Sequence, residues 1–350
     1  MNYINCGNFK TSYEKDAAIY QTTFSKICIY SFLIGLFVLP FFLNSYLLYI
    51  MNMIFISVIA AVGLNILTGF TGLISLGHGA FIGVGAFAAG YLISKFSFGF
   101  FIIIPLAAII TSMVGVIFGT PSLRLKDLYL SIATLAAQFI LEFIFIRAER
   151  ITGGVNGMPV DAPVFFGYTI DNDFRFYFFS LIYTIIMVTA AKNIIRTKIG
   201  RAFVSIRDNY IAAETMGVDL FRYKLLSFAI SSFYAGVAGA LWAYYVRFIT
   251  PEHFTINVSI QYLSMIIIGG LGSILGSIFG TIFMVVLPEL LRHIIGIFSH
   301  YLPVLEQIFP AIREAFYGLV IILFLLFEPE GLARRWNLIK AYWKLWPFSY

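Results

Sequence analysis

Charge is scarce in this sequence. Only 11% of its 350 residues are Asp, Glu, Lys or Arg, whereas roughly 25% of the residues of a soluble domain are charged. No charged side chain occurs between Lys26 and Lys95, and a membrane crossing needs about 20 mostly apolar residues. The short alternating segments of a membrane β-barrel are also absent. The composition therefore predicts an all-α polytopic membrane protein.

Cysteine and catalytic motifs are equally scarce. Cys6 and Cys28 make neither a disulfide framework nor a metal pattern. The chain contains no G-x-x-x-x-G-K-[ST] phosphate loop, and H-E-x-x-H, C-x-x-C and G-x-S-x-G are missing too. Glu289 and His293 share a helix face, but two possible ligands do not make a metal site. We therefore expect no catalytic site, no metal and no cofactor, so the energy for any work done by this chain comes from elsewhere.

Long apolar runs indicate about ten transmembrane helices (8–10). The pair 258–274 and 276–297 is the least certain, because GGLGSILG between them fits a broken or re-entrant segment. The predicted spans lie near residues 27–44, 46–67, 72–93, 99–119, 128–146, 176–195, 225–247, 258–274, 276–297 and 312–328.

The distribution of basic residues predicts the orientation. With the N-terminus inside, 16 of the 23 Lys and Arg residues fall on the cytoplasmic side, where basic loops belong. The net charge of +6 is explained in this way, without a nucleic-acid partner. We expect a cytoplasmic segment 1–26, a transmembrane domain 27–328 and a cytoplasmic or interfacial tail 329–350, with both termini in the cytoplasm.

The segment 196–224 is the most strongly charged loop between apolar helices. Ser205 and Asp208 form an S-x-x-D capping box, and Gly217 suits the C′ position of a helix. These signals predict a short cytoplasmic helix over 206–216, after which Asp219 caps the next span. The alternative is an amphipathic helix that lies on the lipid headgroups.

Polar side chains inside the spans are candidates for a solute pathway. Thr134, Gln138 and Glu142 continue a stripe from Ser131 along one face of an apolar helix. His78 lies in the glycine-rich segment 63–92, and an intramembrane histidine is a functional candidate by default. The alternatives are a structural hydrogen-bond ladder for the stripe and a bond to a neighbouring carbonyl for His78.

Small residues recur at the spacing that lets membrane helices approach closely. Gly79 and Gly83 form one such ridge, and Gly272, Gly276 and Gly280 form a second. Ridges of this kind predict tight helix packing, which a translocation pathway between moving helices would also use.

Together these segments resemble LivM-type permeases of the ABC importers for branched-chain amino acids. The resemblance implies a type II importer-like fold in the bacterial inner membrane. It also implies a LivH-type partner permease, two ABC ATPase subunits and a periplasmic substrate-binding protein. The matching segments are GLNILTGFTGLISLGHGAFIGVGAF, ITGGVNGMP, KIGRAFVSIRDNYIAAETMGVDLFRYKLLSFAIS, PEHF, IIIGGLGSILGSIFG and LPELLR.

Within the resemblance, the cytoplasmic loop is similar to the EAA-x-x-x-G coupling element that docks on the ATPase. Ala212, Ala213 and Gly217 match it, Ile211 stands where Glu is expected, and Glu214 is the nearest acid.

Urea or short amides are the alternative substrates. A stand-alone secondary transporter or an intramembrane enzyme is the alternative class, but neither a clear repeat nor a catalytic constellation supports it.

Overall fold

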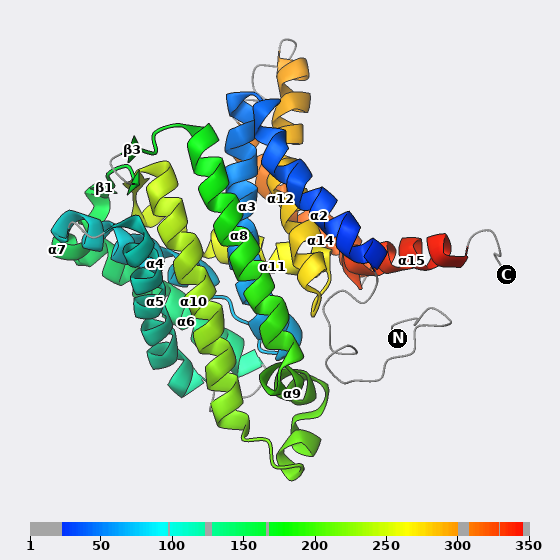
Figure 1. Ribbon diagram of the computed structural model, residues 1–350. Coiled ribbons are helices and arrows are strands. Elements are labelled where there is room, and N and C mark those ends of the chain that lie inside the picture. The colour runs from blue at the N-terminus through cyan, green and yellow to red at the C-terminus, as the bar shows by residue number, and fades with distance from the viewer. Residues whose placement is uncertain are drawn as a thin grey trace.

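The computed structural model describes residues 23–96, 99–122, 128–165, 168–299, 308–328 and 330–345, which form a bundle of helices with two small antiparallel strand pairs (Figure 1). In chain order the longer helices are α2 (Thr23–Val38), α3 (Ser45–Asn65), α4 (His78–Lys95), α5 (Phe100–Ser122), α6 (Leu128–Arg147), α8 (Asp173–Arg196), α9 (Lys198–Thr215), α10 (Leu220–Val246), α11 (Ile256–Gly269), α12 (Ile274–Ser299), α14 (Phe309–Phe327) and α15 (Gly331–Leu345).

The short elements lie mainly at the end of the bundle opposite α9 (Figure 1). Strand β1 (Met158–Pro159) pairs with β4 (Phe248–Ile249), and β2 (Val164–Phe165) pairs with β3 (Tyr168–Thr169). The remaining elements are α7 (Glu149–Thr152), η1 (Leu39–Phe41), η2 (Ile66–Phe70), η3 (Gly154–Asn156) and η4 (Pro251–Phe254).

The prediction of an all-α polytopic membrane protein is confirmed, whereas the number of about ten spans stays a prediction. Helices occupy all ten predicted stretches, but only seven in the described part of the chain are long and apolar enough to cross a membrane. Helix α11 has 14 residues, or about 21 Å of helix, against a hydrocarbon core of about 30 Å. Its turn at Gly270 ends it early. The seven are Ser45–Phe70, Phe100–Pro121, Tyr129–Arg147, Asp173–Arg196, Leu220–Val246, Ile274–Ile297 and Phe309–Phe327.

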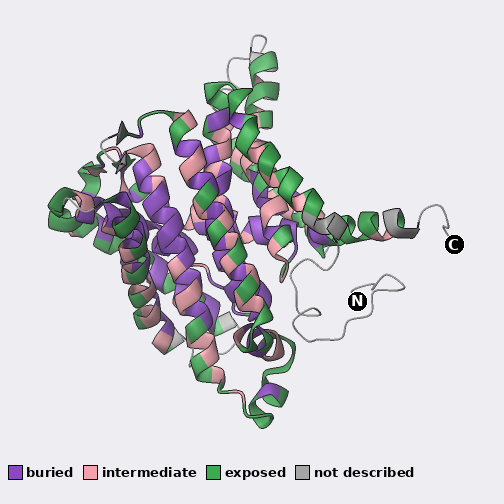
Figure 2. Ribbon diagram, in the orientation of Figure 1, coloured by how far each residue is buried: buried purple, intermediate pink, exposed green. Residues whose placement is uncertain are grey.

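Helices α3, α4 and α10 form the buried centre of the bundle (Figure 2). Glycines allow them to touch: a Cβ added to Gly85 would lie 2.6 Å from the Gly236 Cα, and one added to Gly239 would lie 2.0 Å from the Ile82 carbonyl oxygen. Lipid offers little hydrophobic drive for helix association, so such backbone contacts and interhelical hydrogen bonds hold membrane helices together.

Helix α3 does not end where the sequence predicted. It continues through the π-helical segment η2 to Phe70, and residues 71–77 are non-helical before α4 starts at His78. In lipid the freed backbone groups must find partners inside the protein. The Leu76 N–H donates to Thr134 Oγ1 at 3.0 Å, and the Ala80 N–H donates to Gln138 Oε1 at 2.9 Å.

The start of the helix predicted over 206–216 also differs from the prediction. Helix α9 begins at Lys198, capped by Thr197, and the Ser205–Asp208 capping box is wrong because both residues lie inside the helix. Ser205 Oγ instead donates to the Ala202 carbonyl at 2.8 Å. The helical run is interrupted at Asn209, which has φ −160° and ψ 99°, and Asn209 Oδ1 accepts from the Ala212 N–H at 3.0 Å. Asn209 therefore caps a second short segment.

The end of α9 agrees with its sequence signals. Gly217 has φ +86°, a conformation that glycine adopts without strain. The Val218 N–H donates to the Ala213 carbonyl and the Gly217 N–H to that of Glu214, both at 3.0 Å, which is the Schellman pattern. Asp219 then accepts from the Arg222 N–H at 3.1 Å and caps α10.

The tail folds back onto the bundle as α15, which lies against α11 and α12. The Trp336 ring meets Phe279 edge to face at 5.7 Å, and Lys340 Nζ lies 5.3 Å from the centre of the Trp336 ring. The predicted cytoplasmic segment 1–26 and the end of the tail after 345 lie largely outside the described residues.

Candidate functional site

The tip of α9 carries exposed apolar side chains at a polar end of the molecule. Met216 is 87% exposed and Ile211 is 60% exposed, and Glu214 beside them is exposed too. The projecting tip appears in green at the bottom of Figure 2. Exposed apolar side chains rimmed by polar ones mark interaction sites when they lie outside the lipid. The arrangement suits a protein partner.

The four residues expected to couple to an ATPase have different environments. Ala213 is buried at 4% exposure, whereas Ala212 and Glu214 face outward. Gly217 has no atom within 4 Å of the position that a Cβ would take. Ala213 is therefore shielded from solvent, while Ala212 and Glu214 present the surface of the tip.

The first part of α9 is anchored between α8 and α10. The Phe203 ring is fully buried and meets Tyr223 of α10 edge to face at 6.5 Å. A Cβ on Gly200 would lie 2.0 Å from the Ile195 carbonyl oxygen of α8. Such contact leaves this part of α9 little freedom to move without its neighbours.

Gln138 of α6 is the centre of a buried hydrogen-bond network. Its Oε1 accepts from the Ala80 N–H at 2.9 Å and from Ser259 Oγ at 3.0 Å, and its Nε2 donates to the Phe254 carbonyl at 2.7 Å. Ser259 Oγ also accepts from the Gly79 N–H at 2.8 Å. Gln138 thus ties α6 to α4, α11 and η4, which matches the hydrogen-bond ladder considered for the stripe.

Glu142, one turn further along α6, is different. It is partly exposed, and it makes no hydrogen bond or ion pair with any other described residue. Its neighbours Phe139, Ile140 and Phe143 are exposed. A carboxylate among apolar side chains at membrane depth is costly unless it faces water or protein. The stripe therefore divides into a structural part at Gln138 and an outward-facing part at Glu142.

His78 stands at the start of α4 and is buried to 1% exposure. Its Nε2 lies 3.0 Å from the Ala60 carbonyl oxygen, to which it donates, and its ring meets Tyr262 edge to face at 5.8 Å. These contacts are those of the structural alternative that the sequence left open.

The predicted glycine ridges lie at close contacts. A Cβ on Gly79 would meet Ser259 Oγ at 2.9 Å, and one on Gly83 would meet the Phe145 ring at 2.7 Å. In the second ridge, a Cβ on Gly276 would lie 2.5 Å from the Gly269 carbonyl oxygen, and a Cβ on Gly280 would lie 1.9 Å from the Met265 carbonyl oxygen. Gly272 differs, because it precedes α12 and has φ +74°. Its place is in the turn.

At the opposite end of the bundle, His253 closes the η4 turn. Its Nδ1 lies 3.0 Å from Thr250 Oγ1, and its ring packs edge to face on Trp242 at 4.9 Å. Burial lowers the pKa of His253 below its usual value, and the nearby Glu252 carboxylate opposes this only in part. No group of three or more His, Cys, Asp or Glu residues in the described ranges could hold a metal ion.

Three residues of the loop escaped the sequence analysis. Met216 and Asn209 had local signals, since an apolar residue just before a C′ glycine and an Asn inside a helix are both conspicuous. Arg207 had none, because its Nη1 donates to the carbonyl of Gly69, 138 positions away, at 3.0 Å.

The comparison with known families agrees with this architecture. A family model described as "Branched-chain amino acid transport system / permease component" matches residues 46–325. The chain belongs to this family. It is a multi-pass membrane permease, and the matched range includes α9, η2 and the turn between α11 and α12.

Curated relatives are similar over most of the chain. The Escherichia coli high-affinity branched-chain amino acid transport system permease protein LivM is 30% identical over 86% of this chain and 74% of its own length. The LivM protein of Salmonella typhimurium is 28% identical over 89% and 76%. A probable LivH permease of Methanocaldococcus jannaschii is 27% identical over 62% and 71%. No solved structure matches the chain significantly.

Proposed function

We propose that this chain is one permease subunit of an ATP-driven importer for branched-chain amino acids in a bacterial inner membrane. The exposed tip of α9, in a chain of this permease family, carries the proposal. A phosphate loop is missing from the sequence. Two ABC ATPase subunits therefore bind the ATP, and Ala212, Ala213, Glu214 and Gly217 form the element on which one of them docks.

The remaining partners follow from the relatives. A LivH-type permease completes the pathway, because a probable LivH protein is itself similar to this chain. A periplasmic binding protein delivers the amino acid to the end of the bundle opposite α9. Both termini and α9 face the cytoplasm, as the basic residues indicate. The chain crosses the membrane ten times in a type II arrangement: α2, α4 and α11 are added to the seven long apolar helices. Neighbouring subunits shield these three shorter helices from lipid.

Transport is a shift between two packed states of the bundle. ATP-driven closure of the ATPases moves α9, and its anchored part carries α8 and α10 with it. The solute passes between the two permeases along the α6 face that holds Glu142. Gln138 and His78 support that face from behind through their bonds to α4, η4 and α3.

Reconstitution tests this function directly. Liposomes that hold the complete complex should take up labelled leucine only with ATP and binding protein, and liposomes that hold this chain alone should take up none. Full-rate uptake by the chain alone would identify a stand-alone transporter and overturn the proposal. Competition by unlabelled valine and isoleucine, but not by urea or acetamide, should assign the substrate class.

A further inference from the structure

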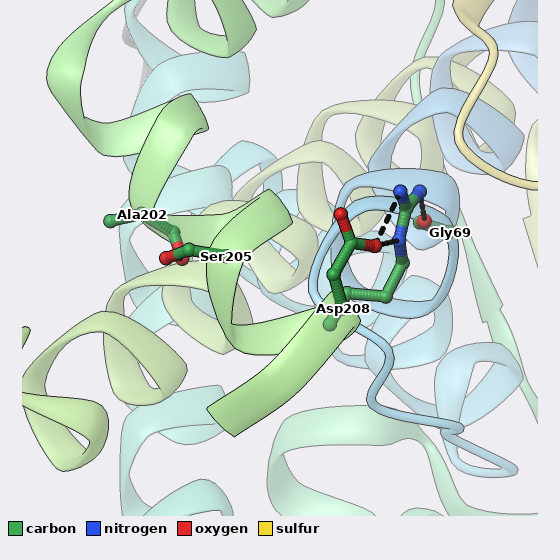
Figure 3. A network of polar contacts seen from close by, with 5 residues as sticks. Gly69, Ala202, Ser205 and Asp208 are labelled. Atoms are coloured by element: carbon green, nitrogen blue, oxygen red, sulfur yellow. Dashed lines mark hydrogen bonds and ion pairs between the residues drawn. The ribbon is translucent and has the colours of Figure 1, made fainter. Parts of the chain in front are cut away.

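Arg207 joins α9 to η2, the end of the helical run that begins with α3. It is the second-last residue before the break at Asn209, and its Nη1 donates to the Gly69 carbonyl at 3.0 Å. Its Nε and Nη2 lie 2.9 and 2.8 Å from Asp208 Oδ1. The dashed lines in Figure 3 mark these contacts at Asp208 and Gly69.

The Gly69 carbonyl needs such a partner. It lies in η2, where the helix stops. The N–H groups three and four residues further on bond elsewhere: that of Gly72 to the Thr68 carbonyl and that of Leu73 to the Leu67 carbonyl. The last carbonyls of a helix lack intrahelical partners and carry the negative end of its dipole. A guanidinium satisfies both the acceptor and the partial charge.

A third element meets at the same point. Asn65 of α3 accepts from the Gly272 N–H at 2.9 Å and donates to the Ser273 carbonyl at 2.9 Å, which ties α3 to the turn between α11 and α12. A Cβ on Gly272 would lie 2.8 Å from Arg207 Nη1, and one on Gly72 would lie 3.2 Å from Arg207 Cγ. Both glycines have positive φ, +74° and +79°.

The ion pair between Arg207 and Asp208 contributes too little free energy to explain why Arg207 is held in this place. The side chains of Arg207 and Asp208 are 38% and 61% exposed, and an exposed pair contributes at most about 1 kcal/mol. Asp208 Oδ1 accepts from both Nε and Nη2, so the carboxylate occupies one edge of the guanidinium. The remaining Nη1 then points at Gly69, which a lysine ammonium could not reproduce.

We propose that Arg207 is the positioning residue that fixes α9 to the end of α3, at η2, and to the turn between α11 and α12. As a result, η2 and the 270–273 turn move as one body with α9. The inference rests on the proposed importer function, in which α9 receives the movement of the ATPase. Arg207 passes that movement to the end of η2 and, through Asn65, to the turn between α11 and α12.

Coupling of transport to ATP hydrolysis gives the first test. In the complete reconstituted complex, Arg207→Ala should leave complex assembly and ATP hydrolysis near wild type while leucine uptake per ATP falls by about tenfold, the effect of one lost charge-assisted hydrogen bond. Arg207→Lys keeps the charge but lacks the forked guanidinium, so its leucine uptake per ATP should lie between those of the wild type and Arg207→Ala. Unchanged uptake per ATP in both variants would overturn the proposal.

The matched control is Arg222→Ala. Arg222 is an arginine in the same loop, ion-paired with Asp219 at 2.9 Å, and its side chain is 84% exposed. Its removal should change uptake per ATP by less than about twofold. An equal loss in both alanine variants would mean that any arginine of the loop serves ATPase docking, and the specific role of Arg207 would be rejected.

A distance measurement separates this inference from the importer function. In the full chain with Cys6 and Cys28 replaced by serine, spin labels at Arg201→Cys in α9 and Leu271→Cys in the turn should give one narrow distance distribution in nanodiscs. Adding Arg207→Ala should broaden it clearly. Equal widths would reject this attachment even if transport is ATP-driven, whereas a narrow wild-type distribution with failed import would reject only the importer.

Discussion

Asn209 divides α9 into two parts with opposite surroundings. In the part before it, Phe203 and Ile206 are buried in the bundle and Arg207 reaches the end of α3. In the part after it, Ile211 and Met216 are exposed, and Ala213 is the buried contact. The difference suits the two tasks that the proposed importer gives to α9. In that proposal the exposed part presents a surface to the ATPase, and the anchored part conveys the movement of the ATPase into the bundle.

The largest contrast between the two parts concerns stability. Phe203→Ala removes a fully buried ring and should lower the free energy of unfolding by about 3–5 kcal/mol. Ile211→Ala, which truncates a 60% exposed side chain, should change it by less than about 0.5 kcal/mol. Denaturant or thermal unfolding of the purified chain in detergent measures both. Similar losses in the two variants would erase the distinction between anchored and exposed parts.

Function should show the reverse contrast. Glu214→Arg or Met216→Ala at the tip should reduce ATP-driven leucine uptake by about tenfold or more, the size of a central interface contact, while the unfolding midpoint stays at the wild-type value. Glu214→Gln, which keeps the shape but not the charge, serves as the matched variant. Wild-type uptake by both Glu214→Arg and Met216→Ala would remove the docking role from the tip.

The joint between the parts should respond more weakly. Asn209→Ala removes the side-chain oxygen that accepts from the Ala212 N–H, and loss of such a cap costs about 1 kcal/mol. Amide hydrogen exchange should rise in residues 210–215 and stay unchanged in 198–208. Asn209→Asp retains an acceptor and should exchange like the wild type. Faster exchange on both sides of the joint would show that α9 behaves as one unit.

The smallest effect belongs to the end of the bundle opposite α9. Because the folded-state pKa of His253 is lowered, the neutral ring contributes stability that is complete above the ordinary pKa near 6.5. That stability is lost as the pH falls toward the folded-state pKa. A melting temperature measured at pH 7.5 and at pH 5 should show a smaller decrease in His253→Gln than in the wild type. Equal decreases would contradict this assignment.

The sequence predicted the features that depend on local chemistry. Apolar runs predict the helices, Gly217 ends α9 because its φ must be positive, and Asp219 caps α10. The capping box at Ser205 failed because the same residue types also occur inside amphipathic helices, where tertiary packing decides. The short length of α11 depends on the turn at Gly270, and no window of hydropathy detects that.

Long-range contacts account for what the sequence could not predict in the candidate site. Gln138 bonds to residues 58, 116 and 121 positions away, and Arg207 to one 138 positions away. The stripe containing Gln138 was visible from its helical spacing, but its division into a buried Gln138 and a partly exposed Glu142 was not. That division depends on which neighbours α6 meets.

Site-specific cross-linking tests the central claim, that the tip of α9 meets an ATPase. With Cys6 and Cys28 replaced by serine, a photo-cross-linker is placed at Met216→Cys or at Val155→Cys. Met216 is 87% exposed, and Val155 is 71% exposed in η3, between α7 and β1 in the chain. Helix α7 and strand β1 lie at the end of the bundle opposite α9 (Figure 1). In the complete complex, the label at 216 should capture the ATPase subunit and the label at 155 should not. No capture from 216, or equal capture from both positions, would contradict the account.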